Sequence, residues 1–333
     1  MHPDANAAPK YSVVVPVYLN EETVADLAAA LEGLAERLPG SLEVVFVDDG
    51  SPDNSVPALI EALDAREGRS FSARLARHSR NFGSFAAIRT GLGAASGEYV
   101  AVMAADLQEP PSLIERFFEA LEGGEDIVVG TRTGRADPWP SRVSSRLFWA
   151  LYRRFVWREM PVGGVDVFGC TREFANRLLE LREANTSLVT LVLWLGYQRA
   201  EIPYERLPRA AGKSAWSFRR KLRYLSDSVY SFTDLPIRVL LFLGIFGVLS
   251  SILVATTVAV ARLAGAIDVP GYAATVIVVA LLGAINLFAL GIIGAYVWRG
   301  YENTKGRPDA VVMSEVELTS ADREAPMPEV LDR

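Results

Sequence analysis

The chain has 333 residues, of which 50% are hydrophobic and 22% are charged, and its formal net charge is -6. The single cysteine, Cys170, excludes an internal disulfide framework, and we expect a packed, inert thiol in a reducing compartment. Because His2 and His78 are the only histidines, the sequence also lacks the Cys/His cluster that zinc sites normally use.

Strand and helix patterns alternate through most of the first two thirds of the chain. Residues 1–10 are polar and rich in Pro and Ala, and we expect a flexible N-terminus without the apolar core of a signal peptide. Short β-branched runs such as Tyr11–Val17 and Leu42–Val47 predict buried strands, and helical spacing follows each of them. Residues 11–213 are therefore expected to form an α/β domain with a doubly wound, mostly parallel sheet that binds ligands at the carboxyl ends of its strands.

The first two strands are expected to end in polar motifs. Pro16-Val17-Tyr18-Leu19-Asn20-Glu21 follows the first, and Asp48-Asp49-Gly50-Ser51 follows the second. Adjacent carboxylates at a strand end can accept hydrogen bonds from a base and a ribose. The alternative is that Asp49 or Asp53 merely caps the next helix, as small acidic residues often do.

A third motif follows the strand predicted at residues 99–104. Asp106, Leu107 and Gln108 place a carboxylate and an amide at this strand end. Such oxygen ligands suit Mg²⁺ or Mn²⁺, and the cation would neutralise a diphosphate leaving group. The three motifs together predict a site for a nucleotide diphosphate.

The last third of the chain is expected to meet a membrane. Over residues 214–235, apolar side chains recur every three or four positions among basic ones, which predicts an amphipathic juxtamembrane helix, although packing on a protein core would give the same stripe. Residues 236–262 and 269–298 are long and apolar enough for two transmembrane helices. Lys and Arg flank the pair, whereas the linker holds only Arg262.

This charge distribution predicts a two-span protein of the cytoplasmic membrane whose head and both termini are cytosolic. Residues 302–333 are polar and acidic, and we expect a flexible cytosolic tail. Glycines in the spans would permit close helix packing and thus a homo-oligomer.

From Tyr11 to Pro308 the chain resembles glycosyltransferase family 2, in particular the branch of dolichyl-phosphate mannose synthase and bacterial GtrB-like enzymes. Besides the strand-end motifs, the resemblance rests on Ser79-Arg80-Asn81-Phe82-Gly83, Gly163-Gly164-Val165-Asp166, Gly212-Lys213-Ser214-Ala215-Trp216 and Tyr301-Glu302-Asn303. It implies a GT-A-like fold. One residue departs from the pattern, because Ala104 stands where the family usually has the first Asp of an Asp-Ala-Asp motif.

The resemblance also implies roles for individual residues. The implied donor-nucleotide site consists of Pro16, Tyr18, Glu21, Asp48, Asp49 and Ser51. Asp106 and Gln108 would hold the metal, and Asp106 and Asp166 would be the catalytic residues. A loop that closes over the diphosphate would use Arg209, Lys213, Ser214 and Trp216, and an acceptor phosphate would bind Arg132, Arg142, Ser145 and Arg146.

The resulting hypothesis is an inverting, metal-dependent glycosyltransferase that moves one sugar from a nucleotide-sugar to a polyprenyl phosphate of the undecaprenyl type, with no nucleic-acid partner. Two alternatives stay open. A transferase of the same fold would act on a hydroxyl of a glycan or glycolipid, in which case Asp166 would have to be a base. A catalytically silent membrane scaffold is suggested by Ala104.

Overall fold

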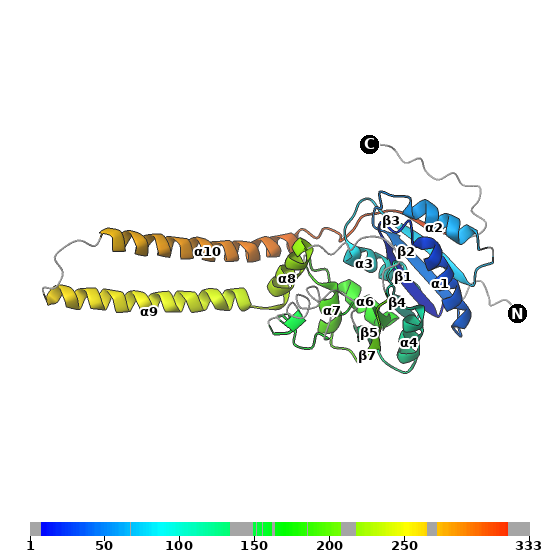
Figure 1. Ribbon diagram of the computed structural model, residues 1–333, viewed down its shortest axis with the longest axis horizontal. Helices are drawn as coiled ribbons and strands as arrows, with labels where there is room; N and C mark the ends of the chain where they lie inside the picture. The colour runs from blue at the N-terminus through cyan, green and yellow to red at the C-terminus, as the bar shows by residue number, and fades with distance from the viewer. Residues whose placement is uncertain are drawn as a thin grey trace.

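The computed structural model describes residues 8–318 apart from residues 67, 134–148, 151, 155, 162–163, 185, 208–217 and 265–271. An α/β head carries a hairpin of two long helices that projects away from it (Figure 1). The strands are β1 (Tyr11–Val17), β2 (Leu42–Asp48), β3 (Phe71–His78), β4 (Tyr99–Val102), β5 (Ile127–Arg132), β6 (Phe168–Thr171), β7 (Arg199–Tyr204) and β8 (Val312–Glu317). The helices are α1 (Val24–Arg37), α2 (Ser55–Asp64), α3 (Ser84–Ala94), α4 (Pro111–Glu122), α6 (Arg172–Glu180), α7 (Leu188–Trp194), α8 (Phe218–Phe232), α9 (Leu235–Leu263) and α10 (Tyr272–Thr304).

The strands form one sheet in the order β7-β5-β6-β4-β1-β2-β3-β8. The pairs β4–β1, β1–β2, β2–β3 and β5–β7 are parallel, which confirms the expected mostly parallel α/β fold. The strand β6 pairs antiparallel with both β4 and β5, and β8 pairs antiparallel with β3. The fold is therefore doubly wound at its centre and antiparallel where β6 and β8 join it.

Helices cover both faces of the sheet. Along β1, Val13 and Val15 pack with α1, α2 and α4 on one face, whereas Val14 packs with α3 and α6 on the other. Because both faces are covered, all seven residues of β2 are buried. Burial of a valine or leucine side chain stabilises the fold by about 1.5–3 kcal/mol, so this central strand anchors the loops at its end.

Cys170 lies in β6 and is buried. Burial disfavours the thiolate and raises the pKa of Cys170 to about 12. The prediction of a packed, inert thiol is confirmed.

The segment after the hairpin does not match the flexible tail that we expected from residue 302 onward. The helix α10 continues to Thr304, and Val312–Glu317 forms β8 on the edge of the sheet beside β3. The amide of Ser79 donates to Val311 O at 3.0 Å, and the amide of Leu318 donates to Ala73 O at 2.8 Å. The expectation was wrong up to residue 318 because an unpaired sheet edge offers hydrogen bonds to any extended segment that reaches it. Residues 319–333 lie outside the described part of the chain.

The helix α8 occupies much of the predicted amphipathic segment. Leu225 and Phe232, two members of its apolar stripe, pack against the core on the α3 and α6 side of the sheet. That part of the stripe therefore contacts the head rather than lipid, which corresponds to the alternative left open by the sequence. The start of the predicted segment, residues 214–217, is outside the described residues.

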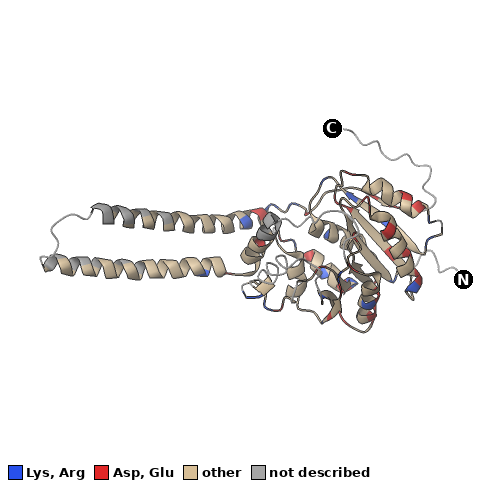
Figure 2. Cartoon of the chain, in the orientation of Figure 1, with Lys and Arg blue, Asp and Glu red and all other residues tan. Residues whose placement is uncertain are grey.

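The helices α9 and α10 are long and apolar enough to cross a membrane, with candidate spans at Leu235–Val254 and Leu281–Thr304. No residue of either hydropathy window is buried, so the two helices are not core helices of the head. Charged residues appear on the head and at the head end of the hairpin (Figure 2). At that end, Arg299 bonds to Asp227 of α8 at 2.6 Å, and Asn303 accepts a hydrogen bond from the amide of Ala184 at 2.9 Å.

Candidate active site

The carboxyl ends of three central strands meet at one edge of the sheet. Because β4, β1 and β2 are neighbours and run parallel, the loops that follow them lie at the same edge. Asp48 is the last residue of β2, and Asp106 follows β4, which ends at Val102. The structure therefore brings together the three motifs that the sequence places at separate strand ends.

The loop after β1 is held in a strained turn. Leu19 has a φ of 57°, a left-handed conformation that costs a non-glycine residue about 1–2 kcal/mol. Two hydrogen bonds of Asn20 offset this cost: its Oδ1 accepts from the amide of Tyr18 at 2.9 Å, and its amide donates to Ser55 Oγ at 2.8 Å. Pro16 and Tyr18 remain half-buried beside the turn. Of the predicted donor residues, only Asp48 and Asp49 are buried, so Pro16 and Tyr18 are accessible from solvent, as are Glu21 and Ser51.

Two further predicted donor residues help to fix the neighbouring loop. Glu21 accepts hydrogen bonds from the amide and side chain of Asn54 at 3.2 and 3.1 Å, just before α2 begins. Ser51 Oγ accepts from the amide of Leu19 at 3.4 Å, which joins the loops after β1 and β2. Both side chains therefore hold the loops after β1 and β2 in place.

Asp49 organises the loop after β3. Its carboxylate accepts hydrogen bonds from the amides of Phe82 and Gly83, both at 2.8 Å, and lies 2.9 Å from His78 Nδ1. The other ring nitrogen of His78 lies 2.9 Å from Thr90 Oγ1 on α3. A buried carboxylate with these partners is a structural anchor, because few acceptor sites remain for a ligand.

Asp48 is also buried, with 1% of its side chain exposed. Its Oδ1 accepts from the amide of Ser51 at 3.0 Å, and its Oδ2 lies 3.6 Å from Arg77 Nε. Gly50 follows with a φ of 67°, and a Cβ there would lie 2.6 Å from the Arg80 carbonyl carbon. Only glycine fits at this approach of the two loops.

Asp106 lies in a second strained turn. Leu107 has a φ of 54°, and the half-buried carboxylate of Asp106 accepts from the amide of Gln108 at 3.4 Å. The side chain of Gln108 is turned toward the segment after β7, where its Oε1 accepts from Arg206 at 2.6 Å and its Nε2 donates to Leu207 O at 3.4 Å. The turn leaves Asp106 half-buried, and Gln108 ties the turn to the segment that follows β7.

Glu109 is buried beneath this turn. Burial, and after it the negative charge of Asp166, raise the pKa of Glu109 to about 7. Its Oε1 lies 3.5 Å from the hydroxyl of Tyr204 and 3.8 Å from Arg206 Nε, while its Oε2 has no hydrogen bond. The crowding of carboxylates here is what a bound cation would relieve.

Asp166 connects this carboxylate group to an arginine. Its Oδ2 accepts from Arg132 and, at 3.1 Å, from the hydroxyl of Tyr204. Burial and the charge of Asp166 raise the pKa of Tyr204, so this hydroxyl stays protonated and donates. We call Asp106, Glu109 and Asp166, with Arg132, Tyr204 and Arg206, the acid cluster.

The structure describes only part of the predicted basic machinery. Arg132 belongs to the acid cluster, where it is paired with Asp166. The remaining predicted contacts of the acceptor phosphate and of the closing loop lie outside the described residues: Arg142, Ser145, Arg146, Arg209, Lys213, Ser214 and Trp216.

The residues at this edge fit a magnesium or manganese ion that the donor diphosphate would complete. Magnesium is usually held by one or two carboxylates together with substrate phosphates. Asp106 offers one such carboxylate, and the buried Oε2 of Glu109 is a second oxygen without a hydrogen bond. Within the described part of the chain, no group of three His, Cys, Asp or Glu side chains is arranged to hold a metal by itself.

Sequence reasoning missed the residues that hold the site together. His78, Tyr204 and Arg206 come from two segments that lie far apart in the chain. For His78 a signal was available, since it is the only histidine between residues 3 and 333 and directly precedes the Ser79–Gly83 motif. For Tyr204 and Arg206 we find no local signal beyond their position at the end of a strand.

Known proteins are similar to this chain over most of its length. Residues 12–180 match the model of the family described as Glycosyl transferase family 2. The uncharacterized glycosyltransferase sll0501 of Synechocystis sp. is 30% identical over 298 residues, which cover 89% of this chain and 92% of the relative. CsbB of Bacillus subtilis, whose name also describes a glycosyltransferase, is 33% identical over 301 residues and 90% of each chain.

One similar solved structure is that of glucosyl-3-phosphoglycerate synthase of Mycobacterium tuberculosis, in complex with Mn²⁺, UDP and glucosyl-3-phosphoglycerate. It has a TM-score of 0.47 and 20% identity over 66% of this chain and 77% of that chain. The family match itself begins inside β1 and ends with α6, so it covers Asp48, Asp106 and Asp166.

Proposed function

Because the chain belongs to glycosyl transferase family 2, we propose that it transfers one sugar from a nucleotide-sugar to a polyprenyl phosphate at the cytoplasmic face of a membrane. It is a glycosyltransferase that uses a nucleotide-sugar donor. The main support for a lipid acceptor is that the apolar hairpin is bonded to the head that contains the acid cluster. The ion pair of Arg299 with Asp227 joins α10 to α8, and β8 joins the segment after α10 to the sheet.

On the donor side, the nucleoside would lie against Pro16, Tyr18 and the backbone of the loop after β2. Asp49 acts mainly as a positioning residue in this proposal, because its carboxylate is buried and hydrogen-bonded to the loop after β3. Asp48 bonds to the amide of Ser51 through Oδ1, and its buried Oδ2 has no hydrogen bond. Asp106 would hold the divalent cation together with the donor diphosphate. When bound, the cation would neutralise the charge that develops on the leaving diphosphate.

In the proposed reaction, a phosphate oxygen of the acceptor attacks the anomeric carbon from the face opposite the diphosphate. The bond from that carbon to the diphosphate breaks, and a nucleoside diphosphate leaves with inversion at the anomeric carbon. Arg132 would orient the incoming phosphate, since its planar donor fork matches two phosphate oxygens. By resemblance, Lys213 and Trp216 would close over the diphosphate.

The surroundings of Asp166 favour a phosphate acceptor over a hydroxyl acceptor. A hydroxyl must lose its proton to a base, whereas a phosphate monoester is already anionic near neutral pH. The Oδ2 of Asp166 is bonded to Arg132 and Tyr204, so this oxygen already serves as the partner of two donors. Asp166 would then position Arg132 for the acceptor phosphate.

The proposed topology follows from charge. Basic residues flank the hairpin on its head side, including Arg238, Arg299 and Lys305, which favours a cytosolic head and a linker on the outer side. Proteolysis of right-side-out vesicles should leave the head intact. Digestion of the head by external protease would contradict this orientation.

The acceptor can be tested by mass spectrometry of reaction products. The purified full-length protein is incubated with Mg²⁺ or Mn²⁺, a panel of UDP-, GDP- and dTDP-sugars, and either undecaprenyl phosphate or the alcohol undecaprenol. We expect a product one sugar heavier from the phosphate only. A product from the alcohol, with none from the phosphate, would replace this proposal with the hydroxyl transferase.

A further inference from the structure

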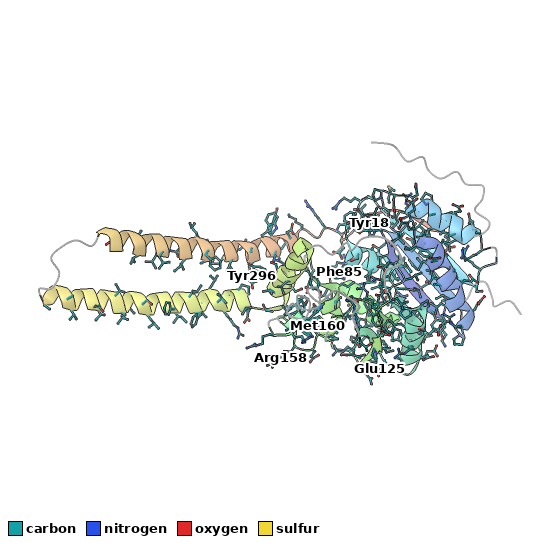
Figure 3. All side chains as sticks on the ribbon, viewed as in Figure 1. Tyr18, Phe85, Glu125, Arg158, Met160 and Tyr296 are labelled. Carbon is teal, nitrogen blue, oxygen red and sulfur yellow. The ribbon has the colours of Figure 1, made fainter. Side chains whose placement is uncertain are left out.

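A groove lies where the hairpin meets the head, between the end of α8, the start of α9 and α10. Its volume is about 770 Å³, within the range of pockets that hold small molecules. Figure 3 shows Tyr296, one of its lining residues, at the head end of α10. We call this space the foot groove. It shares no residue with the acid cluster.

We propose that the foot groove binds the phosphodiester headgroup of an anionic membrane phospholipid that is not a substrate. This inference rests on the membrane placement proposed above. The occupant is assigned by the charge, the apolar wall and the position of the groove.

The charge of the groove matches a lipid with one negative charge. Its lining includes Arg154, Arg238 and Asp234, which gives a formal net charge of +1. Arg238 Nε donates to Asp234 Oδ2 at 2.8 Å, and this bond occupies one of the five N–H donors of the guanidinium. The side chain of Arg238 is 74% exposed, so its other donors are accessible to a phosphate.

The wall beside these charges suits the region where a lipid headgroup meets its chains. Phe232 and Ile237 line the groove together with Tyr296, whose hydroxyl donates to Thr233 O at 3.3 Å. Aromatic side chains with one polar end are typical of the interface between membrane and water. The groove also opens where α9 begins, which is the level at which a span would enter the bilayer.

Contacts between α8 and α10 hold the walls of the groove in place. Arg299 on α10 bonds to Asp227 on α8 at 2.6 Å and lies over the ring of Tyr230 at 4.8 Å. The rings of Tyr230 and Tyr296 pack edge to face with centroids 5.2 Å apart. Since these contacts hold α8 against α10, a lipid seated in the groove would bind a preformed site.

A substrate lipid fits this groove less well than a resident phospholipid. The acceptor phosphate must reach the sugar at the acid cluster, whereas a phosphate bound by Arg154 and Arg238 would be held by residues that take no part in that cluster. We therefore assign the groove to a lipid that stays in the bilayer and fixes the head at the membrane surface.

Native mass spectrometry of the full chain tests the assignment. The delipidated protein in neutral detergent is titrated with phosphatidylglycerol or phosphatidylcholine, and R154Q/R238Q is compared with R158Q, whose residue is exposed on the same segment but does not line the groove. Wild type and R158Q should retain one phosphatidylglycerol, and the affinity of R154Q/R238Q should be about tenfold lower. Equal retention by the double variant would overturn the proposal.

Two further arms separate the possible causes. Phosphatidylglycerol should raise the apparent melting temperature of wild type and R158Q but not that of R154Q/R238Q. A cooperative melting transition of the double variant would show that it is folded. Displacement of the bound lipid by an equimolar amount of undecaprenyl phosphate would assign the groove to the acceptor and overturn the proposal. Lipid retention requires no sugar transfer, so a chain that binds phosphatidylglycerol but glycosylates no lipid phosphate would refute the proposed function alone.

Discussion

The acids after β2 and the acids of the acid cluster lie at the same edge of the sheet but are treated differently by the fold. Asp49 is surrounded by donors: two backbone amides and His78. Glu109 lies near the charges of Asp166 and Asp106, and one of its oxygens has no hydrogen bond. A carboxylate whose oxygens all accept hydrogen bonds stabilises the loop that donates them. Carboxylates that lie close together repel one another, and a bound cation would reduce this repulsion. The comparison assigns scaffolding to Asp49 and chemistry to the acid cluster.

The largest expected effect is on catalysis at the acid cluster. The substitution Asp106→Asn should lower the rate of sugar transfer at least about 100-fold, because the cation that would neutralise the leaving diphosphate loses its carboxylate ligand. Initial rates at saturating Mg²⁺ or Mn²⁺ measure this. A rate within twofold of wild type would remove the acid cluster from the reaction and revive the silent scaffold that Ala104 suggests.

In the acid pair after β2, the expected effect is on stability. In Asp49→Asn the side-chain NH₂ group would face an amide donor of Phe82 or Gly83, so the variant should lose about 2 kcal/mol of unfolding free energy. Denaturation without substrate measures the loss, with Asp64→Asn, at an exposed acid of α2, as the matched control. Wild-type stability in the Asp49 variant would show that this acid is not an anchor.

The buried carboxyl of Glu109 should also make the stability of the protein depend on pH. Because the pKa of Glu109 is about 7 in the folded protein and ordinarily 4.5, the folded state retains a proton that the unfolded chain has released, and stability falls as pH rises. Between pH 6 and pH 8, wild type should lose about 1.4 kcal/mol relative to Glu109→Gln. Denaturation with chelator present measures the stability of both proteins as a function of pH. Parallel curves for wild type and Glu109→Gln would contradict the raised pKa of Glu109.

The smallest expected effect concerns the hydroxyl between Asp166 and Glu109. Tyr204→Phe removes one hydrogen bond to Asp166, worth about 1 kcal/mol, and should lower kcat about fivefold with little change in the KM of the donor. Tyr99→Phe is the control, because Tyr99 begins β4 and so lies at the edge of the sheet away from the acid cluster. A change confined to KM would place Tyr204 in donor binding instead.

Sequence patterns predicted the central fold well because they are local. The β-branched runs of β1 and β2 and the helical spacing after them do not depend on distant residues. The strand β8 could not be predicted this way, since Val312–Glu317 is exposed and acidic and forms a strand only because the edge of β3 is there to pair with it.

The candidate site was predicted in part for the same reason. Asp48, Asp106 and Asp166 stand out at strand ends or turns. A strand-end acid can bind a ligand or anchor a loop, however, and the choice for Asp49 depends on Phe82 and Gly83, which return to it more than thirty residues later. The burial of Glu109 beneath Tyr204 and Arg206 is likewise decided by the packing of β7, which no local pattern encodes.

The most direct test of the central claim compares product formation by three folded proteins. Wild type, Asp106→Asn and Asp49→Asn are incubated with undecaprenyl phosphate, the preferred nucleotide-sugar and Mg²⁺ or Mn²⁺ below the melting temperature of each, and the lipid products are counted by mass spectrometry. We expect the polyprenyl phosphate-sugar from wild type and Asp49→Asn, and almost none from Asp106→Asn. Undiminished product from Asp106→Asn would contradict the assignment of chemistry to the acid cluster.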